Sequence, residues 1–74
     1  MQNAAQADAH VQAFWIASEI EDYHAACRAS AESDDFGDRC YYADRADDAL
    51  ARLRQMGQGL IAYALQGPPL RRAA

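Results

Sequence analysis

The sequence predicts an all-α protein, an antiparallel hairpin of two long helices that dimerises into a four-helix bundle. Three observations lead to this prediction. Apolar residues recur in alternating steps of four and three in both halves of the chain, a break containing one glycine separates the halves, and the two apolar seams match when the chain folds back at that break.

The first helix is expected over about residues 7–34. No proline or glycine interrupts residues 4 to 36, and Asp8 places a negative charge near the positive end of the helix dipole. The periodic positions of this helix are Ala9, Ala13, Ile16, Ile20, Tyr23, Cys27 and Ser30. This spacing is typical of a helix face that packs along its whole length against another helix.

A turn is expected at residues 35–38. Gly37 suits the left-handed position that ends a helix, and Asp38 suits the N-cap of the helix that follows. Ser33 and Asp35 are alternative N-caps, and either of them would start the second helix a few residues earlier.

The second helix is expected over about residues 38–66, and residues 67–74 are expected to form a flexible tail. Gly67 and the two prolines after it end this helix, because proline cannot supply the next backbone donor. Gly57 and Gly59 are placed inside the helix, where Gly57 would leave room for a bulky neighbour such as an aromatic side chain. The seam residues are Tyr42, Ala46, Ala49, Leu53, Met56, Leu60 and Tyr63.

The two seams agree in register if the chain is one domain of residues 1–74 that folds back near residue 36 or 37. Facing residues then have numbers that add up to about 72 or 73. The predicted pairs include Cys27 with Ala46, Ile20 with Leu53, Ile16 with Met56, Ala13 with Leu60, and Ala9 with Tyr63 or Ala64. Two unrelated helices need not match in this way, so the pairing favours an antiparallel hairpin.

A second set of apolar residues lies away from this seam. At 100° per residue, Val11, Phe14 and Trp15 fall on the opposite side of the first helix from Ile16 and Ile20. The complete predicted interface is Val11, Phe14, Trp15, Tyr41, Ile61 and Leu65. An apolar patch of this kind usually marks an interface, here the core of a homodimeric bundle, with a different protein partner as the alternative.

Composition supports association. The chain has 74 residues, of which 51% are apolar, but eighteen of its residues are alanines that contribute little burial each. A monomer of this size is marginally stable without a partner, a metal or a disulfide. The net charge of −4 argues against direct binding to nucleic acid, because neutralising phosphates needs a basic surface.

Acidic residues are concentrated near the turn. Residues 19–48 hold ten of the eleven acidic side chains against three arginines, a net charge of −7. The candidate partner-binding carboxylates are Asp34, Asp35, Asp38, Asp44, Asp47 and Asp48. They are interpreted either as a solvated face, as charges that steer an antiparallel dimer, or as a surface for a basic protein partner.

A metal site is the alternative function. Glu21 and His24 have the Glu-x-x-His spacing of helical di-iron sites, and the predicted register places Asp48 nearly opposite His24. The carboxylates are too few for such a site, and Glu21 points toward the polar side, where Arg52 can pair with it. A hydrogen bond from His24 to Asp48 is therefore favoured over a metal.

The cysteines are expected to be reduced thiols. Cys27 is predicted to be a small core residue against Ala46, and a disulfide to Cys40 is geometrically unfavourable. His24 and Cys27 share one helix face, but further zinc ligands would have to come from another protomer.

The predicted function is that of a non-enzymatic helical interaction protein: a regulator, an adaptor or an inhibitor. The sequence contains no nucleophile with a positioned base and no glycine-rich phosphate loop, so neither catalysis nor a cofactor is expected. Size and charge also suit a phage- or plasmid-encoded inhibitor of a host complex. Without a signal-peptide pattern or a membrane-spanning apolar run, the expected location is the cytoplasm.

Overall fold

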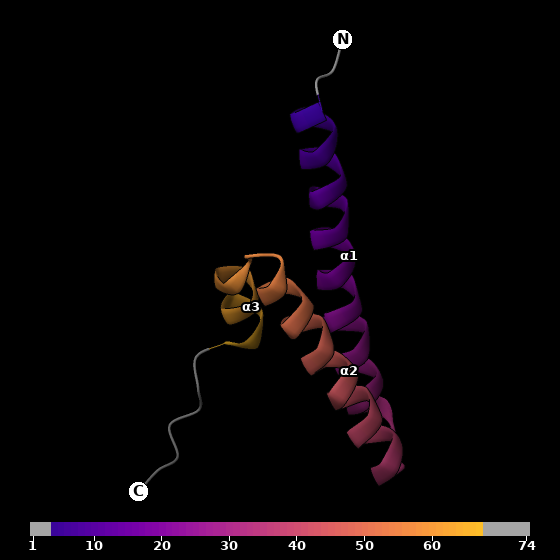
Figure 1. Cartoon of the computed structure of the whole chain (residues 1–74). Coiled ribbons are helices and arrows are strands. Elements are labelled where there is room, and N and C mark those ends of the chain that lie inside the picture. Colours follow the sequence, from indigo (N-terminus) through magenta and orange to yellow (C-terminus); the bar gives the residue numbers. More distant parts are fainter. Residues whose placement is uncertain (1–3, 68–74) are drawn as a thin grey trace, which may run out of the picture.

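The computed structural model describes the backbone of residues 4–67 and the side chains of residues 8–67. Within this range the chain forms three helices and no strand: α1 (Ala4–Glu32), α2 (Phe36–Gln55) and α3 (Gly59–Gln66) (Figure 1). The all-α prediction is confirmed. Most of the predicted tail lies outside the described residues.

The turn between α1 and α2 is held by local side-chain hydrogen bonds. Asp35 has an extended backbone, with φ −90° and ψ 126°, and its carboxylate accepts a hydrogen bond of 2.8 Å from the backbone N–H of Asp38. Asp35 is therefore the N-cap of α2, as in one of the two alternatives, and Asp38 lies inside the first helical turn. Gly37 also lies inside α2 and does not end α1.

The single helix predicted over residues 38–66 is wrong, because the chain reverses between Gln55 and Gly59. Gly57 adopts a left-handed backbone with φ 78°. Its N–H donates to the Arg54 carbonyl at 3.0 Å, and the Gln58 N–H donates to the Leu53 carbonyl at 2.9 Å. This pair of bonds is a Schellman motif, which ends α2 and satisfies two of its last carbonyls. Gly57 thus ends a helix and does not make room for an aromatic side chain.

Helix α3 folds back beside the C-terminal end of α2 (Figure 1). It also contacts α1, because the Tyr23 hydroxyl donates a 3.3 Å hydrogen bond to the Leu65 carbonyl. The seam residues predicted for the second helix are buried or half-buried from Tyr42 to Met56 and exposed beyond it. Leu60 and Tyr63, which are expected in the seam, are 87% and 56% exposed, because the reversal turns Ala62 inward in their place.

The core lies where the three helices meet. Leu50, Leu53 and Ala62 are buried there, and the half-buried side chains packed around them are Ile16, Ile20, Tyr23, Met56, Ile61 and Leu65. Among the described residues, the buried apolar side chains are four alanines and two leucines, namely Ala26, Ala46, Ala49, Ala62, Leu50 and Leu53. Two large buried side chains make a small core even for a chain of this length.

Helix α1 extends well beyond its neighbours (Figure 1). Its 29 residues span about 43 Å, whereas the 20 residues of α2 span about 30 Å. The radius of gyration is 15.4 Å, compared with about 11 Å for a compact domain of this length. The N-terminal turns of α1 therefore project past the core.

None of the helices in the described part of the chain combines the length and the apolar composition needed to cross a bilayer.

Candidate interaction surface

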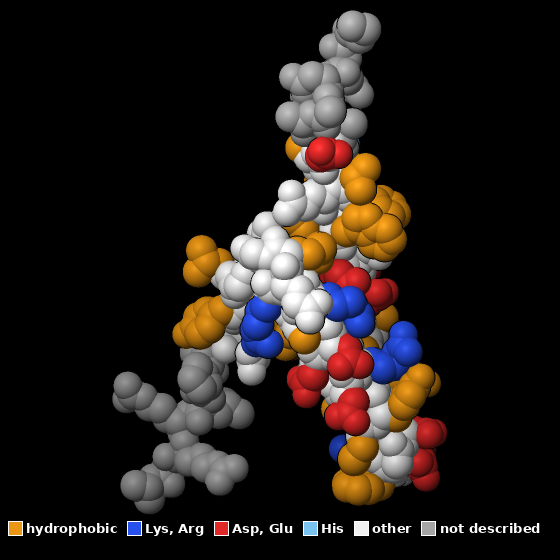
Figure 2. All heavy atoms as spheres, viewed as in Figure 1, with side chains coloured by type: hydrophobic (Ala, Val, Ile, Leu, Met, Phe, Trp, Pro, Cys, Tyr) orange, Lys and Arg blue, Asp and Glu red, His pale blue; other side chains and the backbone are white. Residues whose placement is uncertain are grey.

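The projecting part of α1 has a ridge of large apolar side chains. Val11, Phe14 and Trp15 are 55%, 65% and 52% exposed, and we call them the aromatic ridge. The rings of Phe14 and Trp15 pack edge to face, with centroids 5.7 Å apart and planes at 76°. Figure 2 shows apolar side chains gathered on the upper part of α1. The predicted exposure of these three residues agrees with the structure.

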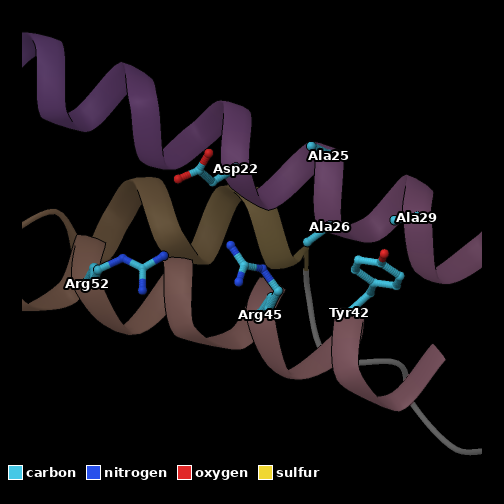
Figure 3. A pocket seen from close by; sticks show the side chains of 7 residues that line it. All are labelled: Asp22, Ala25, Ala26, Ala29, Tyr42, Arg45 and Arg52. Atoms are coloured by element: carbon cyan, nitrogen blue, oxygen red, sulfur yellow. The ribbon is translucent and has the colours of Figure 1, made fainter. Parts of the chain in front are cut away.

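Below the ridge, a shallow groove of about 260 Å³ runs between α1 and α2 (Figure 3). Alanines of α1 line one side of this groove, and longer polar side chains of α2 line the other. The lining residues are Asp22, Ala25, Ala26, Ala29, Tyr42, Arg45 and Arg52. We call it the alanine groove. Because alanine has only a methyl group, the backbone of α1 is open to close approach by another helix.

An ion pair joins α1 and α2 beside the groove. The Nε of Arg52 donates to the Oε2 of Glu19 at 2.7 Å, and Glu19 is only 8% exposed. The predicted partner of Arg52 is Glu21, and this prediction is wrong. Glu19 lies next to Ile20 on the side of α1 that faces α2, whereas Glu21 is exposed on the outer side.

Arg45 stands on the α2 side of the groove and is oriented by Tyr41. Its Nη1 donates to the Tyr41 hydroxyl at 3.3 Å, and its guanidinium carbon lies 5.8 Å from the centre of the Tyr41 ring. This hydrogen bond raises the pKa of Arg45 above its ordinary value, with smaller contributions from the charges of Asp22 and Asp48. Arg45 adds a positive charge to a groove that Asp22 also lines.

Three further residues of the predicted interface have different surroundings. Tyr41 is 56% exposed, as expected for a contact residue. Ile61 and Leu65 are half-buried against the core of Leu50, Leu53 and Ala62, so much of their apolar surface already packs within the chain. The exposed apolar side chains of α3 are instead Leu60 and Tyr63.

The six aspartates proposed for a basic partner are all on the surface near the turn and along α2. The carboxylate of Asp35 caps α2 and so has a structural role. The other five are Asp34, Asp38, Asp44, Asp47 and Asp48, which form the acidic end of the molecule and are all exposed. Their role in partner binding stays a prediction.

The residues of the alternative metal site do not converge. Glu21, His24 and Asp48 are exposed, and the His24 ring lies edge-on to Tyr23 with centroids 5.6 Å apart. Among the described residues, no three side chains of histidine, cysteine, aspartate or glutamate lie close enough to hold one ion.

The predicted burial of Cys27 against Ala46 is wrong. Cys27 and Cys40 are both exposed free cysteines. Helix α1 turns Ala26 toward α2, where Ala26 is 7% exposed, so the neighbouring Cys27 lies at the edge of the contact.

Sequence reasoning missed Glu19 and the α2 side of the groove. The sequence does contain a signal for Glu19. This residue directly precedes the seam residue Ile20, so it lies next to the buried face of the helix.

None of the protein-family models, curated proteins or solved structures compared with this chain matches it.

Proposed function

We propose that this chain is a non-enzymatic protein-interaction protein of the cytoplasm, a regulator, adaptor or inhibitor that binds through the outer face of α1. The observation that supports this function best is the aromatic ridge. Phe14 and Trp15 stand side by side, each more than half exposed, on a helix end that projects beyond the core. Exposed apolar patches of this kind usually mark interaction sites.

The composition of the surface also supports this function. Tryptophan, tyrosine and arginine are the side chains that contribute most often to binding hot spots. Trp15 lies on the ridge, while Tyr42, Arg45 and Arg52 line the alanine groove. The acidic end of the molecule adds a long-range field that would orient a partner during encounter.

A photo-crosslinking experiment tests this function. A photoreactive phenylalanine analogue replaces Phe14 in the full chain, expressed in the cells where the chain occurs naturally. We expect an adduct of defined mass, because the position 14 side chain contacts the bound protein. The same analogue at the exposed position Gln55 on α2 should give no such adduct.

Two aspartate variants serve as matched controls. Trp15→Asp should abolish the adduct, whereas Leu60→Asp should retain it, because Leu60 is an exposed apolar residue of α3 outside the ridge. Equal labelling from positions 14 and 55, or an adduct that survives Trp15→Asp, would contradict the proposed function.

A further inference from the structure

Two residues of the aromatic ridge, Val11 and Trp15, lie on one strip along α1 with residues of the α1 side of the alanine groove. The positions of this strip are Val11, Trp15, Ser18, Asp22, Ala25 and Ala29, which follow one another in alternating steps of four and three. This is the spacing of a helix-packing seam, and it is separate from the face of α1 that packs on α2. Large side chains occupy the N-terminal end of the strip and alanines the C-terminal end.

The strip is complementary to itself when two copies run antiparallel. Positions whose numbers add up to 40 then face each other across a two-fold axis: Val11 faces Ala29, Trp15 faces Ala25, and Ser18 faces Asp22. Each large side chain meets an alanine of the second copy, so the two helices can interdigitate. Trp15 of one copy would enter the alanine groove of the other, beside Arg45, where an indole ring and a guanidinium attract each other.

Charge selects the antiparallel arrangement over the parallel one. Parallel helices would bring the two acidic ends together, whereas antiparallel helices keep them at opposite ends of the dimer. At the centre of the strip, the Ser18 hydroxyl can donate to the Asp22 carboxylate of the second copy. Asp22 also lines the groove together with Arg45, whose positive charge would offset that of Asp22 when the interface excludes water.

The contact has the length that a stable dimer needs. In this register residues 8–32 of the two copies overlap, a strip of about 37 Å. The aromatic ridge alone exposes on the order of 300 Å² per copy, against about 800 Å² per partner in a standard interface. The alanines and the groove lining contribute to the remainder. Among the described residues, Leu50 and Leu53 are the only large side chains buried within the monomer, so it gains much from this additional burial.

We infer that the partner of this surface is a second copy of the chain, bound through α1 against α1 in antiparallel two-fold register, with Trp15 of each copy in the alanine groove of the other. This inference rests on the proposed function and names its partner.

The purified full-length chain should sediment at twice its monomer mass of 8.1 kDa. Trp15→Asp should raise the dimer dissociation constant at least about 30-fold, because each dimer loses two hot-spot side chains. Leu60→Asp should leave the constant unchanged.

Cysteine pairs test the register directly. In a background with Cys27→Ser and Cys40→Ser, Val11→Cys and Ala29→Cys are made as separate chains. A mixture of the two should form intermolecular disulfides on mild oxidation, and neither chain alone should do so. Position 11 of one copy lies 18 residues, about 27 Å, from position 11 of the other in the antiparallel register.

Disulfides from the Val11→Cys chain alone would indicate a parallel dimer and overturn the inference. A dimer whose mixed chains do not crosslink would overturn it as well. A purified chain that stays monomeric, together with a position 14 adduct to a different protein in cells, would remove this partner and leave the proposed function intact.

Discussion

The Glu19–Arg52 ion pair joins two side chains of unequal exposure. The Glu19 side chain is 11% exposed and that of Arg52 is 47% exposed. A charged group left unpaired in a buried position loses its hydration without compensation, whereas an exposed one is solvated. The two partners therefore should not be equivalent in mutagenesis.

Arg52→Met should lower the free energy of unfolding by about 1–3 kcal/mol, because it leaves the Glu19 carboxylate buried without its donor. Glu19→Gln retains an acceptor for Arg52 and should cost less than about 1 kcal/mol. Arg54→Met is the matched control, since the guanidinium of Arg54 donates to the Gln66 side chain at 3.1 Å on the surface and the substitution should cost little. Urea unfolding at one protein concentration measures all three. A larger loss for Glu19→Gln than for Arg52→Met would refute the argument from exposure.

The ionisation of Tyr23 makes the stability of the fold depend on pH in the alkaline range. Burial, followed by the hydrogen bond and charge of Cys27 and the charge of Asp47, raises the pKa of Tyr23 above its ordinary value of 10.0. The native state therefore holds this proton more tightly than the unfolded state does. The resulting stabilisation is complete below pH 10 and is lost as the pH rises through the higher pKa of the folded chain.

Tyr23→Phe removes the donor to the Leu65 carbonyl and should cost about 1 kcal/mol at pH 7. The same variant should lose less stability than the original chain between about pH 9 and pH 11, because its position 23 has no proton to release. Tyr63→Phe, at an exposed tyrosine, should change neither quantity. Denaturant unfolding across this pH range measures both effects, and an equal alkaline response in the two variants would exclude Tyr23 as the responsible group.

At the level of elements, two glycines close in sequence differ in conformation. Gly57 has φ 78°, a region that residues with a Cβ adopt at a cost, while Gly59 begins α3 and has open space where a Cβ would lie. Gly57→Ala should lower the free energy of unfolding by about 1–2 kcal/mol. Gly59→Ala should be neutral or stabilise by up to about 1 kcal/mol, since alanine favours helix and restricts the unfolded chain. Thermal unfolding of the two variants makes the comparison, and equal effects would contradict the assigned role of Gly57.

The long apolar periodicity explains why the sequence does not predict the break. Leu53, Met56, Leu60 and Tyr63 continue the four-three spacing across Gly57, so the pattern alone is that of one helix. Whether a glycine keeps a helical backbone or adopts a left-handed one depends on the tertiary contacts that the residues after it make in each case. Here the reversal places Ala62 in the core beside Leu50 and Leu53. It also lets Ile61 and Leu65 pack against this core, which a continuous helix would not do in this way.

The same reversal accounts for the part of the candidate surface that sequence reasoning misplaced. Helical geometry places Val11, Phe14 and Trp15 away from the predicted seam, but residues 8–15 are exposed on every side of α1, because α2 ends at Gln55 and α3 does not continue along this part of α1 (Figure 1). The assignment of Ile61 and Leu65 to an interface depends on a straight second helix, and the fold gives these two residues intramolecular neighbours instead.

The whole molecule is an elongated body with a small core near the middle of α1 and an acidic end at the turn (Figure 2). The molecule measures 54 Å by 30 Å by 15 Å. Because it is so thin, much of the chain has one side that contacts no other part of the molecule. An antiparallel second copy would supply neighbours for the projecting end of α1 and keep the acidic ends apart. Assembly and stability are therefore expected to be linked in this protein.

The sequence by itself determined the all-α fold, the long first helix, the place of the first turn and the outward position of Phe14 and Trp15. These features depend on helical periodicity and on signals between residues that are close in the sequence. Both can be recognised without knowing which distant residues come into contact. Only the tertiary structure decided the left-handed Gly57, the third helix and the pairing of Glu19 with Arg52. Each of these depends on which residues far apart in the chain come into contact, and local periodicity contains no information about that choice.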